Sequence, residues 1–255
     1  MRKTVLALVL GLTPMLTACA TAQAAEITVY SVGLVGNGFE KAVADWSKKT
    51  GNTVKLGLPL AQSPLGVIVN AMDTQPADIV ILPVADLKTH AAKYRPGTSR
   101  DIGRVLFSLG AKTAGGASPG IATEREFQNA VAGKTILTND PATSLNGRMV
   151  KAVLDRPAFS SVKQITAPGN SALQLAKSEA DFVMSVLPEQ IMAAPDVKVV
   201  GEVPASLGLK IDFGGGVLTK ATQPEVARQF LDYLSTPDAQ ALWKSGGVAV
   251  PIPAN

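Results

Sequence analysis

Apolar positions along residues 26–255 follow two spacings in turn, and this alternation predicts strands and helices one after another. Residues 27–30 form a short run rich in β-branched and aromatic side chains, which is typical of a strand. Four apolar residues then recur on one face of a predicted helix, namely Phe39, Ala42, Val43 and Trp46. Gly51 suits the end of that helix. The unbroken apolar run at 77–82 predicts a strand that is covered on both faces.

Predicted strands and helices alternate as far as the C-terminus. The other strands are expected at residues 54–58, 104–109, 135–137, 162–165, 181–186, 197–200 and 209–218. The other helices are expected at residues 65–72, 124–131, 146–154 and 171–177, with two more at the end of the chain. Thr222–Glu225 predicts a capping box before the first terminal helix, and Thr236 predicts the N-cap of the second.

This order of elements predicts an α/β fold of two lobes, each a mainly parallel sheet flanked by helices. About 230 residues follow the N-terminal segment, a length that suits two lobes. Hydrophobic residues make up 46% of the chain and charged residues 17%, so both lobes can bury a core. We assign residues 26–105 and 212–255 to a first lobe and residues 106–211 to a second, because the terminal helices follow a return strand.

Residues 1–25 have the three parts of a secretory signal peptide. Arg2 and Lys3 precede an apolar run at 5–12, and small residues follow up to Ala25. Pro14 interrupts the run well short of the roughly 20 residues that a membrane-spanning helix needs. We therefore expect export to the periplasm.

A second interpretation of the same segment is a lipoprotein signal of residues 1–18. Leu16–Cys19 resembles a lipobox, in which Cys19 becomes the lipidated residue. Cys19 is also the only cysteine of the chain, so the mature core has no disulfide under either interpretation.

Composition and motifs argue against several function classes. The net charge of +4 includes Arg2 and Lys3, and no cluster of basic residues follows, so nucleic-acid binding is not expected. Gly116–Gly120 matches the G-x-S-x-G string of a nucleophile elbow, but Pro119 has no N–H for an oxyanion. The only histidine, His90, precedes this string and is expected to be solvated. One histidine and one cysteine cannot build a zinc or copper site. We predict no enzymatic activity, no cofactor and no metal.

Small polar residues and glycines occupy four predicted strand-to-helix junctions. They are Ser31 with Gly33; Gln62 with Ser63; Ser144, Asn146, Gly147 and Arg148; and Gly169 with Asn170. Ligands of open α/β sheets bind beyond the carboxyl ends of strands, where helix N-termini expose N–H groups and a partial positive charge. Several such junctions around one cleft predict an anion site. Ordinary N-capping favours the same residue types and stays an alternative. Arg148 either pairs with the anion or points into solvent.

Further segments carry a family resemblance, namely Pro76–Ile81, Asn139–Pro141, Ser178–Asp181, Ala227–Leu234 and Pro237–Leu242. Through them nearly the whole mature chain resembles type II periplasmic solute-binding proteins of ABC transporters, in particular the molybdate-binding group. The resemblance implies two lobes joined by hinge strands, a ligand held between them, and delivery of that ligand to an ABC permease in the inner membrane. We expect a monomer.

The chain departs from the molybdate-binding group at the ligand site. The resemblance carries over Ser63, Asn146 with Gly147, and Gly169 as contacts. It places Leu34 where the family has a serine and Val186 where the family has a tyrosine. We therefore expect a molybdate-like oxyanion or a small organic anion whose apolar part lies near Leu34, Leu65 and Val186. The alternative is a tethered ligand sensor or interaction protein on the same fold, without a role in transport.

Overall fold

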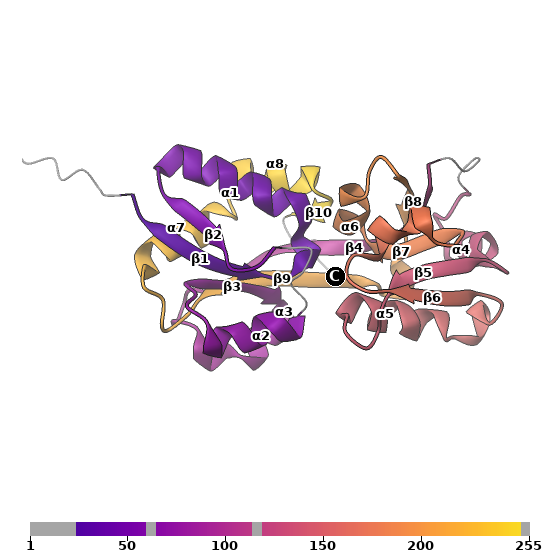
Figure 1. The fold of residues 1–255 in the computed structure, drawn as a ribbon, viewed down its shortest axis with the longest axis horizontal. Coiled ribbons are helices and arrows are strands. Elements are labelled where there is room, and N and C mark those ends of the chain that lie inside the picture. Colours follow the sequence, from indigo (N-terminus) through magenta and orange to yellow (C-terminus); the bar gives the residue numbers. More distant parts are fainter. Residues whose placement is uncertain (1–23, 60–64, 114–118, 251–255) are drawn as a thin grey trace, which may run out of the picture.

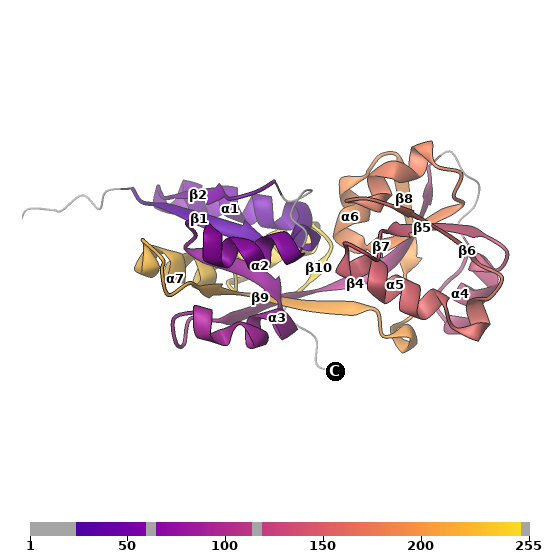
Figure 2. The same cartoon turned by 60° about the horizontal axis from the view of Figure 1, so that its bottom comes forward.

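The elements form two lobes that lie side by side (Figures 1 and 2). The computed structural model describes residues 24–59, 65–113 and 119–250, so the predicted signal segment, Cys19 and Ser118 lie outside the described residues. The first lobe contains β1 (Glu26–Ser31), η1 (Gly33–Val35), α1 (Gly36–Thr50), β2 (Thr53–Leu56), α2 (Leu65–Thr74), β3 (Ile79–Pro83), α3 (Val84–Thr89), α7 (Pro224–Tyr233), α8 (Pro237–Ser245) and β10 (Val248–Ala249). The second contains α4 (Glu124–Val131), β5 (Thr135–Asn139), α5 (Leu145–Leu154), β6 (Lys163–Ala167), the 3₁₀ helix η5 (Ser171–Lys177), β7 (Phe182–Val186), α6 (Leu187–Met192) and β8 (Val197–Glu202).

Two long strands, β4 (Arg100–Lys112) and β9 (Lys210–Val217), connect the lobes. The strand order is β2-β1-β3-β9-β4-β7-β5-β6, with β8 and β10 also paired to β4. Residues Arg100–Leu106 of β4 pair with β9, and from Phe107 onward β4 pairs with β7 instead. The lobe boundaries expected from the sequence, 105/106 and 211/212, fall within these two strands and stay a prediction.

The pairing directions make the carboxyl ends of the two sheets face each other. Strands β3 and β4 are both antiparallel to β9, and β1 is parallel to β3, so β1 and β3 run with β4 towards the second lobe. Strand β7 is antiparallel to β4, and β5 and β6 are parallel to β7, so these strands end towards the first lobe. Val186, the last residue of β7, pairs with Phe107, where β4 passes between the lobes.

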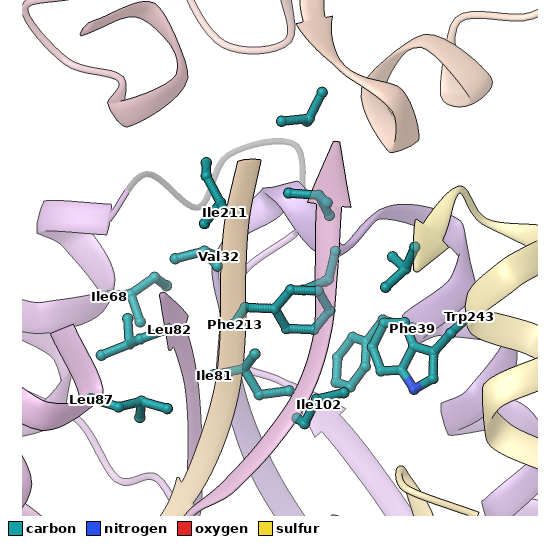
Figure 3. Close-up of a cluster of buried hydrophobic side chains, with 14 of the residues drawn as sticks. Val32, Phe39, Ile68, Ile81, Leu82, Leu87, Ile102, Ile211, Phe213 and Trp243 are labelled. Atoms are coloured by element: carbon teal, nitrogen blue, oxygen red, sulfur yellow. The ribbon is translucent and has the colours of Figure 1, made fainter. Parts of the chain in front are cut away.

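The core of the first lobe lies on both faces of its sheet. Helices α1 and α8 cover one face, and α2 and α3 the other (Figure 1). Phe39 of α1 stacks on Trp243 of α8 with ring centroids 5.7 Å apart, and Phe213 of β9 meets Trp243 edge-on at 5.6 Å. Ile68 and Leu82 pack on the opposite side of β9 (Figure 3). The terminal helices therefore return to the first lobe, as their position after the return strand predicts.

Asp78, buried just before β3, ties the first sheet to the C-terminal helices. One carboxylate oxygen accepts a hydrogen bond from the Thr28 amide at 2.8 Å. The other accepts from the Thr222 amide and hydroxyl and from the Gln223 amide, at 2.7 to 3.0 Å. The predicted capping box at Thr222–Glu225 is therefore wrong. The Thr222 side chain binds Asp78, and α7 begins at Pro224 without a side-chain cap.

Other local expectations were incomplete. The segment Ser171–Lys177 is helical but forms a 3₁₀ helix, and β4 is longer than the expected strand at 104–109. Helix α6 was not predicted. His90 is half-buried at the end of α3 rather than solvated. Among the described residues, none of the helices combines the length and apolar character that a bilayer span requires.

Replacing Asp78 with Asn tests the tie between β1 and α7. The new amide N–H₂ group faces backbone donors, so we expect a loss of about 2 kcal/mol in the free energy of unfolding, measured by urea denaturation. The control is Asp73→Asn, because Asp73 is exposed and pairs with Lys93 at the surface, and it should cost less than about 1 kcal/mol. Equal losses in the two variants would contradict the role given to Asp78.

Candidate functional site

The first predicted junction lies at the carboxyl end of β1. Ser31 is the last residue of β1 and is buried, and its hydroxyl donates a hydrogen bond to the Val32 carbonyl at 3.2 Å. Gly33 and Leu34 form the following 3₁₀ turn η1. Gln62 and Ser63 of the second junction lie outside the described residues, and α2 begins directly after them, at Leu65.

The third junction begins α5, after β5. Ser144 is the N-cap, and its hydroxyl oxygen accepts a hydrogen bond from the Gly147 amide at 3.3 Å. A Cβ at Gly147 would lie 2.2 Å from the Asn139 carbonyl oxygen, so only glycine lets α5 start this close to the end of β5. Asn146 is buried, whereas Arg148 is exposed and its guanidinium reaches the Pro141 carbonyl at 3.5 Å.

The fourth junction begins η5, after β6. Gly169 has a φ of 66°, a conformation that favours glycine, and its carbonyl accepts a hydrogen bond from the Asn139 side-chain amide at 2.6 Å. Asn170 caps η5, because its side-chain oxygen accepts from the Ala172 amide at 2.9 Å. Capping thus accounts for the side chains of both Ser144 and Asn170. The first turn of a helix leaves backbone N–H groups without partners inside the helix.

A buried carboxyl group, which the sequence did not single out, lies among these junctions. Glu189 in α6 accepts hydrogen bonds from the Asn146 amide at 3.1 Å and from the Asn139 amide at 3.3 Å. The Asn170 amide donates to the Glu189 backbone carbonyl at 3.1 Å. Glu189 thereby connects the end of β5, the start of α5 and the cap of η5. The available sequence signal was an acidic residue, preceded by Pro188, directly after the apolar strand at 181–186.

Burial raises the pKa of Glu189 to about 7, although the hydrogen bonds from Asn139 and Asn146 act in the opposite direction. The Ser185 hydroxyl lies near enough to lower this pKa a little, but makes no hydrogen bond of ordinary geometry. None of the salt bridges among the described residues involves Glu189. Near neutral pH this carboxyl group therefore exists in both protonation states.

Helix α6, which carries Glu189, contacts the first lobe. Gly36, the first residue of α1, has a φ of 60°, and a Cβ there would lie 2.7 Å from the Pro188 side chain. A Cβ at Gly247, after α8, would lie 2.8 Å from the Ile191 side chain and 3.0 Å from the Leu187 side chain. Val186, which the family resemblance places at a tyrosine position, is fully buried just before α6. The Glu189 cluster therefore lies beside a direct contact between the lobes.

The raised pKa of Glu189 predicts a pH-dependent stability. Between about pH 4.5 and pH 7 the folded chain holds a proton at Glu189 that the unfolded chain has released, so stability falls as the pH rises through this window and stays constant above it. The loss should be about 3 kcal/mol. The measurement is the difference in free energy of unfolding between the wild type and Glu189→Gln at pH 5 and at pH 8. The same difference at both pH values would contradict the shifted pKa.

Comparison with known proteins agrees with the two-lobed fold. A curated relative, an aconitate isomerase from a Pseudomonas species, is 24% identical over 258 residues, which cover 97% of this chain and 95% of that protein. The periplasmic molybdate-binding protein of Azotobacter vinelandii superposes with a TM-score of 0.67 at 17% identity, over 88% of this chain and 99% of that one. A sulfate-binding protein from Mycobacterium tuberculosis superposes with a TM-score of 0.66 at 18% identity, over 89% of this chain and 88% of that one.

These similarities establish the type II periplasmic binding fold but leave the ligand undetermined. Because one relative is named as an isomerase, the expected lack of enzymatic activity in this chain stays a prediction. A family model, by contrast, matches residues 27–249, which is nearly all of the described chain. The chain belongs to the bacterial extracellular solute-binding protein family.

Proposed function

We propose that the protein is the substrate-binding protein of an ABC transporter and binds a small anion between its two lobes. The observation that carries the proposal is the direction of the strands, which turns the carboxyl ends of both sheets towards each other. Ligands of such sheets bind at that edge. Closure of the lobes about β4 and β9 would remove water from the anion and strengthen its hydrogen bonds, and an inner-membrane permease would then receive it.

Backbone N–H groups are the proposed ligands of the anion. The starts of α5 and η5 lie at the same edge of the second sheet, and the partial positive charge of a helix start favours an anion. Arg148 is exposed and directed at the Pro141 carbonyl, so it is not required for this mode of binding. Some relatives are named for the small anions molybdate, sulfate and aconitate, and others are named for thiamin and iron. An organic anion would place its apolar part near Leu34 and Leu65, whereas Val186 is fully buried and offers it no surface.

Family membership implies a location outside the cytoplasm. We propose the periplasm, reached through the signal segment 1–25, with Cys19 as a lipid anchor if residues 1–18 are removed instead. Acyl-chain analysis of the exported protein distinguishes the two. A lipid-anchored protein encoded without a permease would favour the alternative function, a tethered sensor on the same fold.

Two substitutions of Ser144 test the anion site, because Asp and Asn cap a helix about as well as Ser does. Ser144→Asp adds a negative charge at the start of α5 and should weaken anion binding at least about tenfold, or about 1.4 kcal/mol. Ser144→Asn is the matched control and should bind within about threefold of the wild type. The assay is a thermal-shift titration with molybdate, sulfate, cis-aconitate and trans-aconitate, followed by calorimetry with each anion that stabilises the protein. Equal affinities of the two variants would exclude α5 from the site.

A second candidate function is isomerisation of aconitate, favoured by the alignment with the Pseudomonas enzyme over 97% of this chain. The purified protein would be incubated with trans-aconitate, and cis-aconitate would be measured by chromatography against a boiled sample. If the protein is only a receptor, we expect trans-aconitate to bind without conversion. Formation of cis-aconitate that is lost on boiling would overturn the prediction that this chain is not an enzyme.

A further inference from the structure

We propose that Glu189 couples anion binding to proton uptake, so that the site holds its anion more tightly when this carboxyl group is neutral. The inference deepens the function proposed above and rests on it. It assigns to the site a titratable residue that neither the motifs nor the family resemblance indicated.

The position of the Glu189 cluster is the first argument. Both carboxylate oxygens are held by side-chain amides, one from Asn146 in the first turn of α5 and one from Asn139 at the end of β5. The Asn139 side chain also binds the Gly169 carbonyl and accepts from the Ser171 hydroxyl at 3.2 Å. An anion that accepts hydrogen bonds from the start of α5 would therefore lie next to the Glu189 carboxyl group, which Asn146 of that first turn holds.

The lack of a compensating charge is the second argument. Glu189 is 9% exposed, and only burial and hydrogen bonds shift its pKa, with no contribution from a charged group. The charged side chains of the adjoining elements have other surroundings. Lys41 of α1, Lys177 of η5, Lys198 and Glu202 of β8, and Arg148 and Lys151 of α5 are exposed. Arg104 and Lys112 of β4 bind Asp212 and the Ser178 carbonyl, and Asp140 after β5 accepts a hydrogen bond from the Ala142 amide. A negative charge on Glu189 would therefore act on the anion without a cation between them.

Electrostatics at short range gives the direction of the effect. Two negative charges a few ångströms apart repel strongly in a site from which water is excluded, so a bound anion favours the protonated form of Glu189. Because burial outweighs the opposing hydrogen bonds and raises this pKa to about 7, little free energy is needed to complete the protonation near neutral pH. Affinity should therefore be constant below about pH 6 and should fall by up to about tenfold for each pH unit above 7.

The experiment compares the wild type with Glu189→Gln and Glu189→Asp, using trans-aconitate and molybdate as the two probes. Molybdate is a dianion between pH 6 and pH 8, so its own titration does not enter. The last carboxyl group of trans-aconitate titrates near about pH 6, because it ionises against two negative charges, so the data for this probe are corrected with a titration of the free anion. For the wild type we expect the dissociation constant to rise about tenfold from pH 6 to pH 8, and calorimetry in two buffers to show uptake of about half a proton per anion at pH 7. Glu189→Gln should bind with the same affinity at both pH values and without proton uptake, whereas Glu189→Asp keeps a carboxyl group and should keep a pH dependence.

The outcomes separate this inference from the proposed function. Binding with the same pH dependence in the wild type and in Glu189→Gln would overturn the coupling and leave the anion site intact. No binding of either probe by the wild type at any pH would overturn both. If Glu189→Gln does not fold, two other measurements test the coupling: the pH dependence of the affinity of Glu189→Asp, and the proton uptake of the wild type on binding. A purely structural carboxylate predicts no proton uptake on binding.

Discussion

The pairing of β4 with β9 on one side and with β7 on the other is the constraint on which the rest of the structure depends. Strand β4 is antiparallel to both partners. Its residues up to Leu106 pair with β9, and its residues from Phe107 onward pair with β7. Together with the pairing of β3 with β9, of β1 with β3, of β5 with β7 and of β6 with β5, this arrangement sets the carboxyl ends of the first sheet against those of the second. Arg104 and Asp212 reinforce the crossing with two hydrogen bonds, of 2.5 and 2.9 Å, between β4 and β9.

A site built at such an edge carries buried polar groups, and each of them needs a partner. In the second lobe several of these groups pair with one another: Ser144 and Asn170 cap their helices, and Asn139 and Asn146 hold Glu189. The buried Ser185 hydroxyl, by contrast, has no hydrogen-bond partner. The arrangement also keeps one carboxyl group out of water without a cation, which links the chemistry of the site to pH.

The contact between α6 and α1 connects this cluster to the relation between the lobes. Gly36 allows the start of α1 to touch Pro188, the residue before Glu189. Because the lobes meet beside the titratable group, a change in their separation changes how much water reaches it. In the proposed function, ligand binding, closure and protonation would therefore involve the same few residues.

The amino-acid sequence by itself determined the order of strands and helices, the α/β class and the position of most junctions, because hydrophobic spacing and capping residues are local signals. Local signals did not predict the role of Thr222, whose hydroxyl donates to Asp78 in a distant segment of the chain. They also did not predict helix α6, which is short and follows its strand without a loop. Only the tertiary structure brought Asn139, Asn146 and Asn170 around Glu189, since these residues come from two junctions, after β5 and after β6, and meet α6 only through strand pairing. The shifted pKa of Glu189 follows from that burial, which no single segment of the chain can provide.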